Sequence, residues 1–399
     1  MKVLWIGVDI GPETKQLLIN KGGQIRSAQV SNHNLLCGIR ALDKNITTIN
    51  GPMFESKIFH TVPEEIWADE ISECNIQVAY KNINYLNRLT KEHAIKKKVV
   101  NWAIQNRTDD NVLVFIYSMQ SAFLSAAKRL KKILPNLTIV LIVPDLPQYM
   151  DLSRNYFKQF LKKIDWLRIR SHMKYIDKYV LYTENMADYL NITKEKWILM
   201  EGSYDPNIIG EKSNNNFEKI SVMYSGVLDL RYGIPELLDA MCYLDDSFEL
   251  WLTGDGNARD LIVERAAKDK RIKYFGYLPS RRDLLDKQAS ATMLINPRRD
   301  NEISSKYCFP SKLFEYMVSG RPVLSCYLSG IPSEYHEYLV RLDTISAECI
   351  ANAIKSVSVL SIDQQNEFGA RAKEFVLTSK NMFYQANRVY KFALDNSEM

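Results

Sequence analysis

The chain has 399 residues, of which 46% are hydrophobic and 25% charged, and its formal net charge is +5. This length exceeds the roughly 250–300 residues that one hydrophobic core serves, so the sequence predicts two domains. The composition is that of an ordinary soluble globular protein, and the modest net charge argues against a nucleic-acid partner.

The six cysteines are scattered and form no Cys-x-x-Cys pair, which predicts reduced thiols in a cytoplasmic protein and argues against a zinc site or a disulfide framework. The apolar start of the chain is interrupted at Asp9 and no small-residue cleavage site follows, so we expect a buried strand and no signal peptide. The longest apolar runs, such as 137–143, are far shorter than the roughly 20 residues that span a bilayer.

Short apolar runs alternate with helical patterns along the chain, as in parallel sheets with crossover helices. In the first half we expect strands at 2–8, 111–117, 138–143, 179–183 and 197–201, and helices at 85–106, 121–134 and 156–177. The polar stretch 210–219 is expected to be a linker or an exposed loop.

The second half repeats this alternation. It predicts strands at 220–225, 248–253, 272–275, 291–296 and 322–326, and helices at 235–244, 258–268, 281–289, 312–319, 363–377 and 381–395. We therefore expect an α/β fold with an N-terminal domain at 1–205 and a second domain at 206–378. The segment 379–399 is expected to finish the second domain or to cross back to the first.

The segment 309–322 carries most of the chemical information. Pro310 prevents a helix just before it, Ser311 is a natural N-cap, and Gly320 can supply the left-handed residue that ends a helix. Leu313 lies on the face of this helix that can pack on the sheet. The helix N-terminus then meets the carboxyl ends of the strands, where open α/β sheets bind ligands and where a phosphate is favoured.

Two charged side chains of this helix have alternative interpretations. Glu315 can accept two hydrogen bonds from a ribose diol, and Lys312, one turn earlier, can meet a phosphate as a point charge. Alternatively, the two residues form an exposed i,i+3 ion pair that stabilises the helix by about 0.2–0.5 kcal/mol. Their spacing alone leaves both interpretations open.

Four motifs occur together in a familiar order and spacing: Tyr224-Ser-Gly226, Thr253-Gly-Asp-Gly256, Tyr274-Phe-Gly276 and the segment 309–322. As a set they resemble the donor domain of GT-B glycosyltransferases of family GT4, in particular the bacterial enzymes that build surface polysaccharides. The resemblance covers most of 220–340 and is faint in the first 145 residues. It implies two Rossmann-like domains whose parallel sheets face a central cleft.

By this resemblance, Glu315 matches the second acid of the family's E-x7-E motif, which holds the donor ribose. The donor-binding residues that the resemblance implies are Glu315, Ser225, Gly226, Gly254, Asp255, Arg298, Ser311, Leu313 and Gly23. The implied catalytic residues are Asp145, Lys312 and Arg231.

The chain also departs from the family pattern. The first acid of the motif would fall at Tyr307, and the usual Arg and Lys after the first donor-domain strand would fall near Val227 and Tyr232. Arg231 is adjacent to these positions, and Lys312 or Arg298 can supply the missing positive charge instead.

Several of these candidates have simpler alternatives. The Gly254-Asp-Gly256 sequence either contacts the donor or is only a tight turn. The Gly22-Gly23 pair is either a phosphate loop or a surface turn, and it does not form the fingerprint of a nicotinamide cofactor site. Asp145 either orients the acceptor hydroxyl and takes up its proton or stabilises a turn, while His33 is expected to be a surface histidine.

The segment 156–178 mixes apolar and aromatic residues with lysines and arginines. Such a composition fits a helix that lies on an anionic membrane surface, with a favourable contribution of about 1 kcal/mol per basic residue near that surface. The alternative is a partly buried helix pair with a solvated basic face.

The resemblance implies a retaining glycosyltransferase that moves a sugar from a nucleoside-diphosphate sugar, with a UDP-sugar favoured, to a hydroxyl of a lipid-linked glycan. It also implies that no cofactor or essential metal is needed. The protein is then cytoplasmic, with peripheral attachment to the inner face of the cell membrane left open. Two alternatives share the fold: a sugar-nucleotide epimerase and a non-catalytic partner subunit of a transferase.

Overall fold

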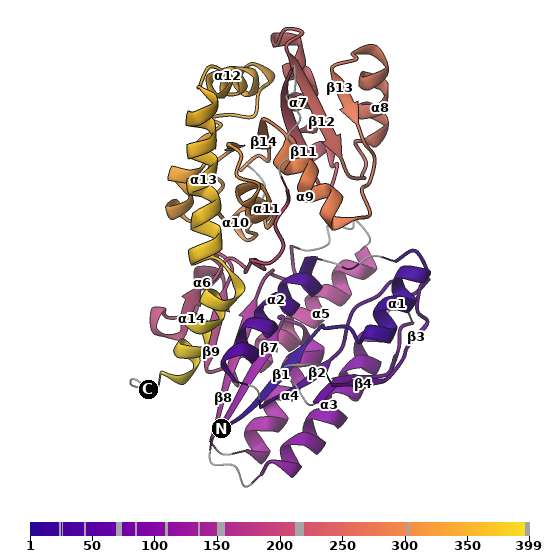
Figure 1. Ribbon diagram of the computed structural model, residues 1–399. Coiled ribbons are helices and arrows are strands. Elements are labelled where there is room, and N and C mark those ends of the chain that lie inside the picture. The colour runs from indigo at the N-terminus through magenta and orange to yellow at the C-terminus, as the bar shows by residue number, and fades with distance from the viewer. Residues whose placement is uncertain are drawn as a thin grey trace. The chain divides into compact units, whose positions relative to one another are not determined.

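The computed structural model describes residues 1–23, 25, 27–43, 45–68, 74–83, 86–107, 111–134, 136–149, 156–211, 219–300 and 303–395. The chain divides into two compact units, which can be followed by colour in Figure 1. Unit 1 comprises Met1–Ser203 together with Met382–Met399, and unit 2 comprises Tyr204–Asn381. Within the described ranges, no helix combines the length and apolar composition needed to cross a bilayer.

Unit 1 is built on an eight-stranded sheet in the order β10-β9-β8-β7-β1-β2-β5-β4. Its strands are β1 (Lys2–Gly7), β2 (Ile46–Asn50), β4 (Glu65–Trp67), β5 (Cys74–Gln77), β7 (Val112–Tyr117), β8 (Leu137–Val143), β9 (Lys178–Leu181) and β10 (Trp197–Leu199). All neighbouring pairs are parallel except β4 and β5. A separate antiparallel pair joins β3 (Thr61–Val62) to β6 (Tyr80–Lys81).

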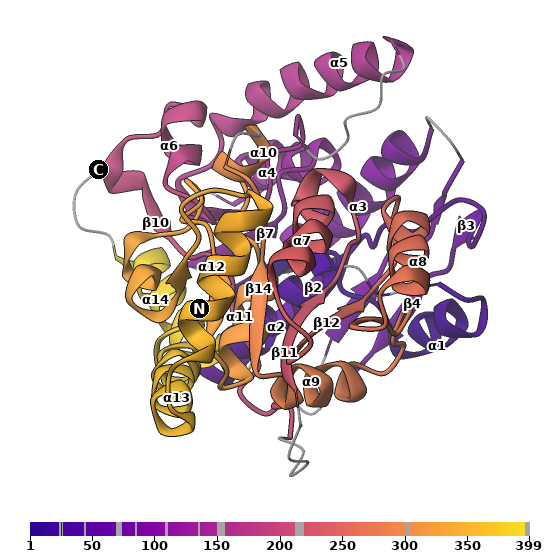
Figure 2. The same ribbon diagram turned by 90° about the horizontal axis from the view of Figure 1, so that it is seen from above.

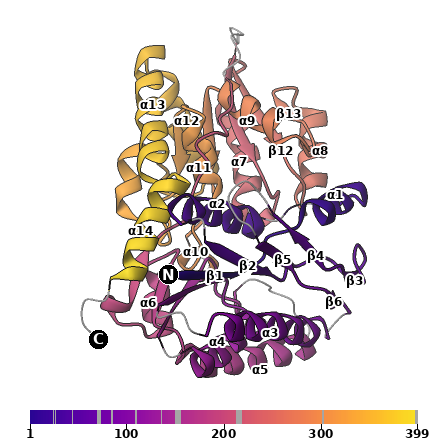
Figure 3. The same ribbon diagram turned by 60° about the horizontal axis from the view of Figure 1, so that its bottom comes forward.

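The helices of unit 1 cover both faces of this sheet. They are α1 (Pro12–Asn20), α2 (Ser27–Leu42), α3 (Asn87–Gln105), α4 (Ser121–Ile133), α5 (Tyr156–Met173), α6 (Asn185–Leu190) and α14 (Met382–Leu394), with the 3₁₀ turn η1 (Lys194–Lys196). Figure 3 shows α3, α4 and α5 on one face and α2 and α14 on the other. The central strand β7 is buried along its whole length, as the apolar run in the sequence requires.

The last helix, α14, belongs to unit 1 although it follows unit 2 in the sequence. It packs on α2 so closely that a Cβ atom on Gly38 would lie 2.3 Å from the carbonyl oxygen of Met382. Lys178 Nζ donates to the carbonyl of Phe392 at 2.6 Å, and Arg388 donates to the carbonyl of Leu199 at 3.2 Å. These contacts fix α14 against both the helix layer and the edge of the sheet.

Unit 2 contains a six-stranded sheet in the order β13-β12-β11-β14-β15-β16, and every neighbouring pair is parallel. The strands are β11 (Ile220–Ser225), β12 (Phe248–Thr253), β13 (Ile272–Tyr274), β14 (Met293–Asn296), β15 (Val323–Ser325) and β16 (Val340–Arg341). The helices are α7 (Ile234–Ala240), α8 (Arg259–Lys268), α9 (Arg281–Ser290), α10 (Ile303–Lys306), α11 (Lys312–Val318), α12 (Ala347–Ser358) and α13 (Ile362–Ser379), with 3₁₀ turns η2 (Leu230–Tyr232), η3 (Met241–Tyr243) and η4 (Ser333–Tyr338).

Contacts between the helices of unit 2 define its two layers, which can be followed in Figure 2: α7 packs with α12, and α11 packs with α13. The strands expected at 220–225 and 248–253 are confirmed with the predicted bounds. The helix expected at 281–289 is confirmed as α9, and the Ser280 side chain caps it by accepting a hydrogen bond from the Asp283 amide. Of the polar stretch 210–219, residues 212–218 lie outside the described residues.

Candidate functional site

The carboxyl ends of β11 and β12 in unit 2 meet α11 at one edge of the sheet. The hydroxyl of Tyr316 on α11 accepts a hydrogen bond from the Ser225 amide at 2.8 Å and donates to the Ser225 carbonyl at 3.0 Å. Tyr316 is fully buried. This reciprocal pair fixes the helix against the end of β11, so the charged residues of α11 are held at the edge where open α/β sheets bind ligands.

The first turn of α11 differs in detail from the prediction. Ser311 stands at the N-cap position, but its backbone is already helical and its side chain makes no capping hydrogen bond, so the predicted N-cap role is wrong. The reason is that the chain turns earlier, with the Leu313 amide bonded to the carbonyl of Pro310 at 2.8 Å. The side chain of Leu313 is fully buried, as expected for the face that packs on the sheet.

Lys312 does not form the exposed ion pair with Glu315 that was the alternative interpretation. Its Nζ donates to the hydroxyl of Tyr224 at 2.9 Å and lies 4.1 Å from the centre of that ring. Burial, with the nearby Arg298 as a smaller cause, lowers the pKa of Lys312 to about 7. The amine therefore lies in a desolvated position beside Gly226, where an added Cβ atom would approach it to 3.2 Å.

Glu315 lies on the same helix but faces a different partner. Its Oε1 is 3.5 Å from Nη2 of Arg281, the first residue of α9. Burial raises the pKa of Glu315, whereas Arg281 and a hydrogen bond with Gln288 act in the opposite direction. Its side chain keeps 28% of its surface exposed, so the carboxylate remains accessible to a ligand.

The glycines at the ends of β11 and β12 allow two loops to approach each other closely. Gly226 and Gly254 both have positive φ angles, of 124° and 133°. A Cβ atom on Gly254 would lie 1.8 Å from the carbonyl oxygen of Gly226, so no other residue fits there. Asp255 is exposed, and its side chain accepts a hydrogen bond from the Gly256 amide at 2.9 Å. The sequence Gly254-Asp-Gly256 therefore lies in the loop between β12 and α8, at the edge where open α/β sheets bind ligands, and its contact with a donor stays a prediction.

The two arginines that were expected to replace the missing basic residues have local partners. Arg231 forms a two-point ion pair with Asp229, with Nε–Oδ1 and Nη2–Oδ2 distances of 2.9 and 2.8 Å. The guanidinium of Arg298 lies over the ring of Tyr232, 5.0 Å from its centre. Asp229 thus already neutralises Arg231, whereas the hydrogen-bond partner of Lys312 is the neutral hydroxyl of Tyr224.

The candidates of unit 1 lie in two different settings. Gly23 ends α1, because its amide bonds to the carbonyl of Leu18 and Gly22 takes a positive φ of 71°. Gly22-Gly23 is therefore a helix-end turn, which favours the surface-turn interpretation. Asp145 follows β8 and is half-buried; together with burial, it raises the pKa of Tyr182 to about 12.

His33 is exposed, as expected, but it belongs to a polar cluster on α2. Its Nδ1 lies 3.2 Å from Oδ1 of Asp9, which follows β1, and its Nε2 lies 3.5 Å from Sγ of Cys37. The hydrogen bonds to Asp9 and Cys37 raise the pKa of His33 to about 10. The imidazole is therefore protonated at neutral pH and is held as half of an ion pair.

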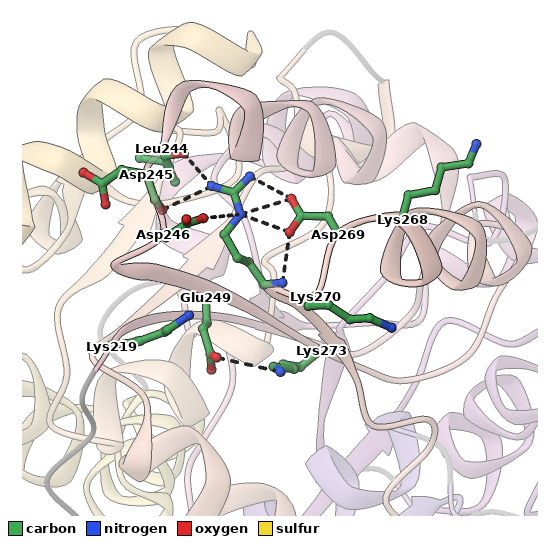
Figure 4. Close-up of a pocket in the computed structure, with 10 residues that line it drawn as sticks. Lys219, Leu244, Asp245, Asp246, Glu249, Lys268, Asp269, Lys270 and Lys273 are labelled. Atoms are coloured by element: carbon green, nitrogen blue, oxygen red, sulfur yellow. Dashed lines mark hydrogen bonds and ion pairs between the residues drawn. The ribbon is translucent and has the colours of Figure 1, made fainter.

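A hollow lined mainly by charged side chains lies at the opposite edge of the unit 2 sheet (Figure 4). Lys219 precedes β11 and Arg271 precedes β13, so both residues mark the amino ends of the strands. Arg271 binds Asp269 and donates to the carbonyl oxygens of Leu244 and Asp245. These interactions tie the strand starts together, and none of the candidate residues lies in this hollow.

Sequence reasoning missed Arg281 and Gln288 as parts of the site. Both lie on α9, which the sequence did predict, and Gln288 donates to Oγ of Ser225 at 2.9 Å. The available signal was the position of Arg281 directly after an N-cap, on a helix that follows a strand of the same sheet. Its contact with Glu315 spans 34 residues and depends on tertiary packing, which no local pattern reports.

Residues 219–358 match the family model described as glycosyl transferases group 1. Unit 2 therefore contains a group 1 glycosyltransferase domain. Solved structures extend the likeness to the whole chain. HepE of Anabaena in complex with UDP is 13% identical with a TM-score of 0.64, covering 98% of this chain and 99% of that chain. Sucrose-phosphate synthase from Thermosynechococcus elongatus is 14% identical with a TM-score of 0.67, covering 98% of each chain.

A third similar structure is WaaG, a glycosyltransferase involved in lipopolysaccharide biosynthesis, at 12% identity and a TM-score of 0.61, covering 99% of this chain and 100% of that chain. At such identities the likeness concerns the fold. None of the curated proteins matches this chain. The prediction of a glycosyltransferase with the GT-B fold is confirmed, whereas family GT4 and a surface-polysaccharide product stay predictions.

Proposed function

We propose that this glycosyltransferase moves a sugar, with retention of anomeric configuration, from a UDP-sugar to a hydroxyl of a lipid-linked glycan in surface-polysaccharide synthesis. The observation that carries the proposal is the position of Glu315, a half-buried but accessible carboxylate at the carboxyl edge of a parallel sheet. Two carboxylate oxygens match the two hydroxyls of a ribose. HepE, whose structure is similar, has been solved in complex with UDP and with UDP-glucose, which supports UDP as the nucleotide.

Lys312 is the proposed cation for the leaving diphosphate. When the bond between the anomeric carbon and the diphosphate breaks, negative charge builds on the phosphate oxygens, and a fixed cation in a desolvated site stabilises that charge strongly. Lys312 has the required burial, and Arg298 lies near enough to influence its titration. A bound diphosphate would favour the charged form of the Lys312 amine, so we expect donor binding to be coupled to proton uptake near pH 7. No essential metal or cofactor is proposed.

Asp145 is the proposed acceptor-side residue. It follows β8 at the carboxyl edge of the unit 1 sheet, and its charge contributes to the raised pKa of Tyr182 and of Tyr117. A carboxylate in such a position can orient an acceptor hydroxyl and take up its proton.

The outer face of α5 supports peripheral attachment to the inner face of a cell membrane. Tyr156, Phe160, Ile164 and Leu167 recur at helical spacing and are all exposed, with exposed fractions from 41% to 89%. Exposed basic residues follow on the same helix and just after it, including Lys163, Arg170 and Lys174. An apolar stripe flanked by basic side chains fits an anionic lipid surface, where a lipid-linked acceptor would be found.

Two observations favour a second candidate, a non-catalytic partner subunit. Tyr307 stands at the position where the family motif has its first acid, and Arg231 forms an ion pair with Asp229. A protein that has lost turnover while keeping the fold would tolerate both changes. Binding of a sugar nucleotide without transfer to any acceptor would support this candidate.

Thermal unfolding in the presence of UDP-, GDP- and ADP-sugars tests the proposal, with NAD as a negative control. A ligand at 100 times its dissociation constant stabilises the folded state by about 2.7 kcal/mol, which raises the melting temperature by several degrees. We expect a UDP-sugar to stabilise the wild type but not Glu315→Ala. The matched control is Glu264→Ala, which removes an exposed carboxylate on α8 and should leave the shift intact. Stabilisation by NAD alone would contradict the proposal.

A further inference from the structure

Arg281 is the cationic side chain that contacts Glu315. It is the first residue of α9, and its position is fixed because Ser280 caps that helix through the Asp283 amide. Its Nη2 lies 3.5 Å from Oε1 of Glu315, and the two side chains keep 37% and 28% of their surfaces exposed. A carboxylate has about four lone-pair sites, so the contact with Arg281 leaves Glu315 able to accept further hydrogen bonds from a ligand.

The other groups around Glu315 cannot replace this charge. Gln288, also on α9, contributes a neutral hydrogen bond to the carboxylate. Lys312, on the same helix as Glu315, is bonded to Tyr224 and loses its charge near pH 7. Tyr204 and Tyr316 are neutral at these pH values because burial raises the pKa of both phenols far above 10. An arginine, in contrast, keeps its charge at every pH at which the protein folds.

We propose that Arg281 is a positioning residue for the donor nucleotide, which holds Glu315 ionised and aimed so that the carboxylate can accept hydrogen bonds from both ribose hydroxyls. This inference rests on the proposed function. An ionised carboxylate is an acceptor at both oxygens, whereas a protonated one turns one oxygen into a donor and loses the match with the diol. Burial alone would favour the protonated form, and the guanidinium opposes that tendency.

The test is the affinity for UDP, measured by titration calorimetry between pH 6 and pH 9, with GDP and ADP in parallel. The readout is the ratio of the dissociation constants of variant and wild type at each pH, because Lys312 titrates in both proteins and cancels in the ratio. For Arg281→Gln we expect an affinity loss of about tenfold at pH 6–7 that shrinks as the pH rises, since hydroxide then removes the proton that the arginine had kept off Glu315.

Two further variants make the test specific. Arg281→Lys keeps the charge and should restore most of the affinity and its weak dependence on pH. Arg282→Gln is the matched control, because Arg282 is exposed and pairs with Glu211 and Asp286 instead, and it should bind UDP as the wild type does.

The outcomes separate the two levels of the proposal. If the wild type binds no nucleotide, the proposed function fails and the inference fails with it. If the wild type binds but Arg281→Gln loses nothing, or loses the same factor at every pH, only the role of Arg281 is overturned. Failure of Arg281→Lys to restore binding would also overturn it, because a positioning charge should tolerate that exchange in part.

Discussion

At the scale of single residues, Lys312 and Lys91 have similarly lowered pKa values, but we propose a binding role only for Lys312. Burial lowers the pKa of both Lys312 in unit 2 and Lys91 in unit 1 to about 7. Each has a neutral hydrogen-bond partner, the Tyr224 hydroxyl for Lys312 and the Gln120 side chain for Lys91, at 2.9 and 2.8 Å. Neither partner compensates fully for the lost hydration of an ammonium group, so both lysines are expected to destabilise the charged protein.

The first prediction concerns Lys312→Met. The folded pKa is below the unfolded value of 10.5, so the unfolded chain binds more protons between about pH 7 and pH 10.5 and stability rises with pH across this window. Below pH 7 the full penalty of burying the charge applies. We expect the methionine variant to be more stable by about 1–3 kcal/mol at pH 7, with the gain shrinking towards pH 10. Urea unfolding at several pH values measures this.

Function distinguishes the two lysines. Lys312→Met should lower UDP affinity at least tenfold, because the proposed phosphate cation is lost, whereas Lys91→Met should gain stability with unchanged UDP affinity. The pair thus tests whether Lys312 is retained for binding at a cost in stability. A Lys312→Met protein that gains stability and binds UDP normally would remove Lys312 from the donor site.

At the scale of elements, α5 carries an unusual exposed surface. The helix packs on α4, and its opposite side bears the apolar stripe described above; Figure 2 shows α5 at the margin of unit 1. Arg168 and Trp166 point to protein partners, Glu92 and the ring of Tyr189 respectively. One side of α5 is therefore packed against the protein, as the helix-pair interpretation expects, whereas binding of the other side to a membrane stays a prediction.

The second prediction is that Phe160→Ser combined with Leu167→Ser weakens binding to phosphatidylglycerol-containing vesicles at least tenfold, as measured by co-sedimentation. Phe160 and Leu167 expose 59% and 67% of their surfaces, so their removal should leave the fold intact. The control is Ile104→Ser on α3, an apolar residue with 58% exposure outside the stripe. Equal binding of the wild type to neutral and anionic vesicles would contradict the electrostatic part of the interpretation.

The helices and strands that could be predicted from the sequence are those with a clear hydrophobic pattern. The fully apolar β7 and the strands β11 and β12 were predicted closely, because buried parallel strands leave an unambiguous pattern. The strand β2 was missed because its sequence is Ile-Thr-Thr-Ile-Asn, in which Thr48 and Asn50 are fully buried in a hydrogen-bond network that local reasoning cannot see. The helix α12 was missed although Ser346 caps it.

The candidate site shows the same division. Residues within one motif, such as Lys312 and Glu315, could be found from spacing and resemblance, but their partners could not. Tyr224 and Arg281 contact them across 88 and 34 residues of chain, so the choice of partner depends on how the helices pack. The i,i+3 spacing of Lys312 and Glu315 was therefore misleading, because each side chain contacts a residue that is distant in the sequence.

At the scale of the whole molecule, each unit contains a helical glycine that packs directly against the backbone of a neighbouring segment. Gly38 in α2 faces Met382 in α14, where an added Cβ atom would lie 2.3 Å from a carbonyl oxygen. Gly369 in α13 faces the backbone of Gly320, and a Cβ atom added at Gly369 would lie 2.0 Å from the Gly320 carbonyl oxygen. The first contact lies within unit 1 and the second within unit 2, so the two glycines are matched probes of the two units.

The third prediction is that Gly38→Ala destabilises unit 1 and Gly369→Ala destabilises unit 2, each by about 1–3 kcal/mol. The added methyl group forces the packed segments apart, and the free energy lost in this way exceeds the free energy that the higher helix propensity of alanine contributes. Hydrogen exchange read by mass spectrometry should show faster exchange confined to the unit that carries the substitution. UDP should protect unit 2 in Gly38→Ala as it does in the wild type, because the proposed nucleotide site lies wholly within unit 2. Faster exchange spread over both units in either variant would mean that they unfold as one cooperative body, and the nucleotide would then stabilise α14 and unit 1 as well.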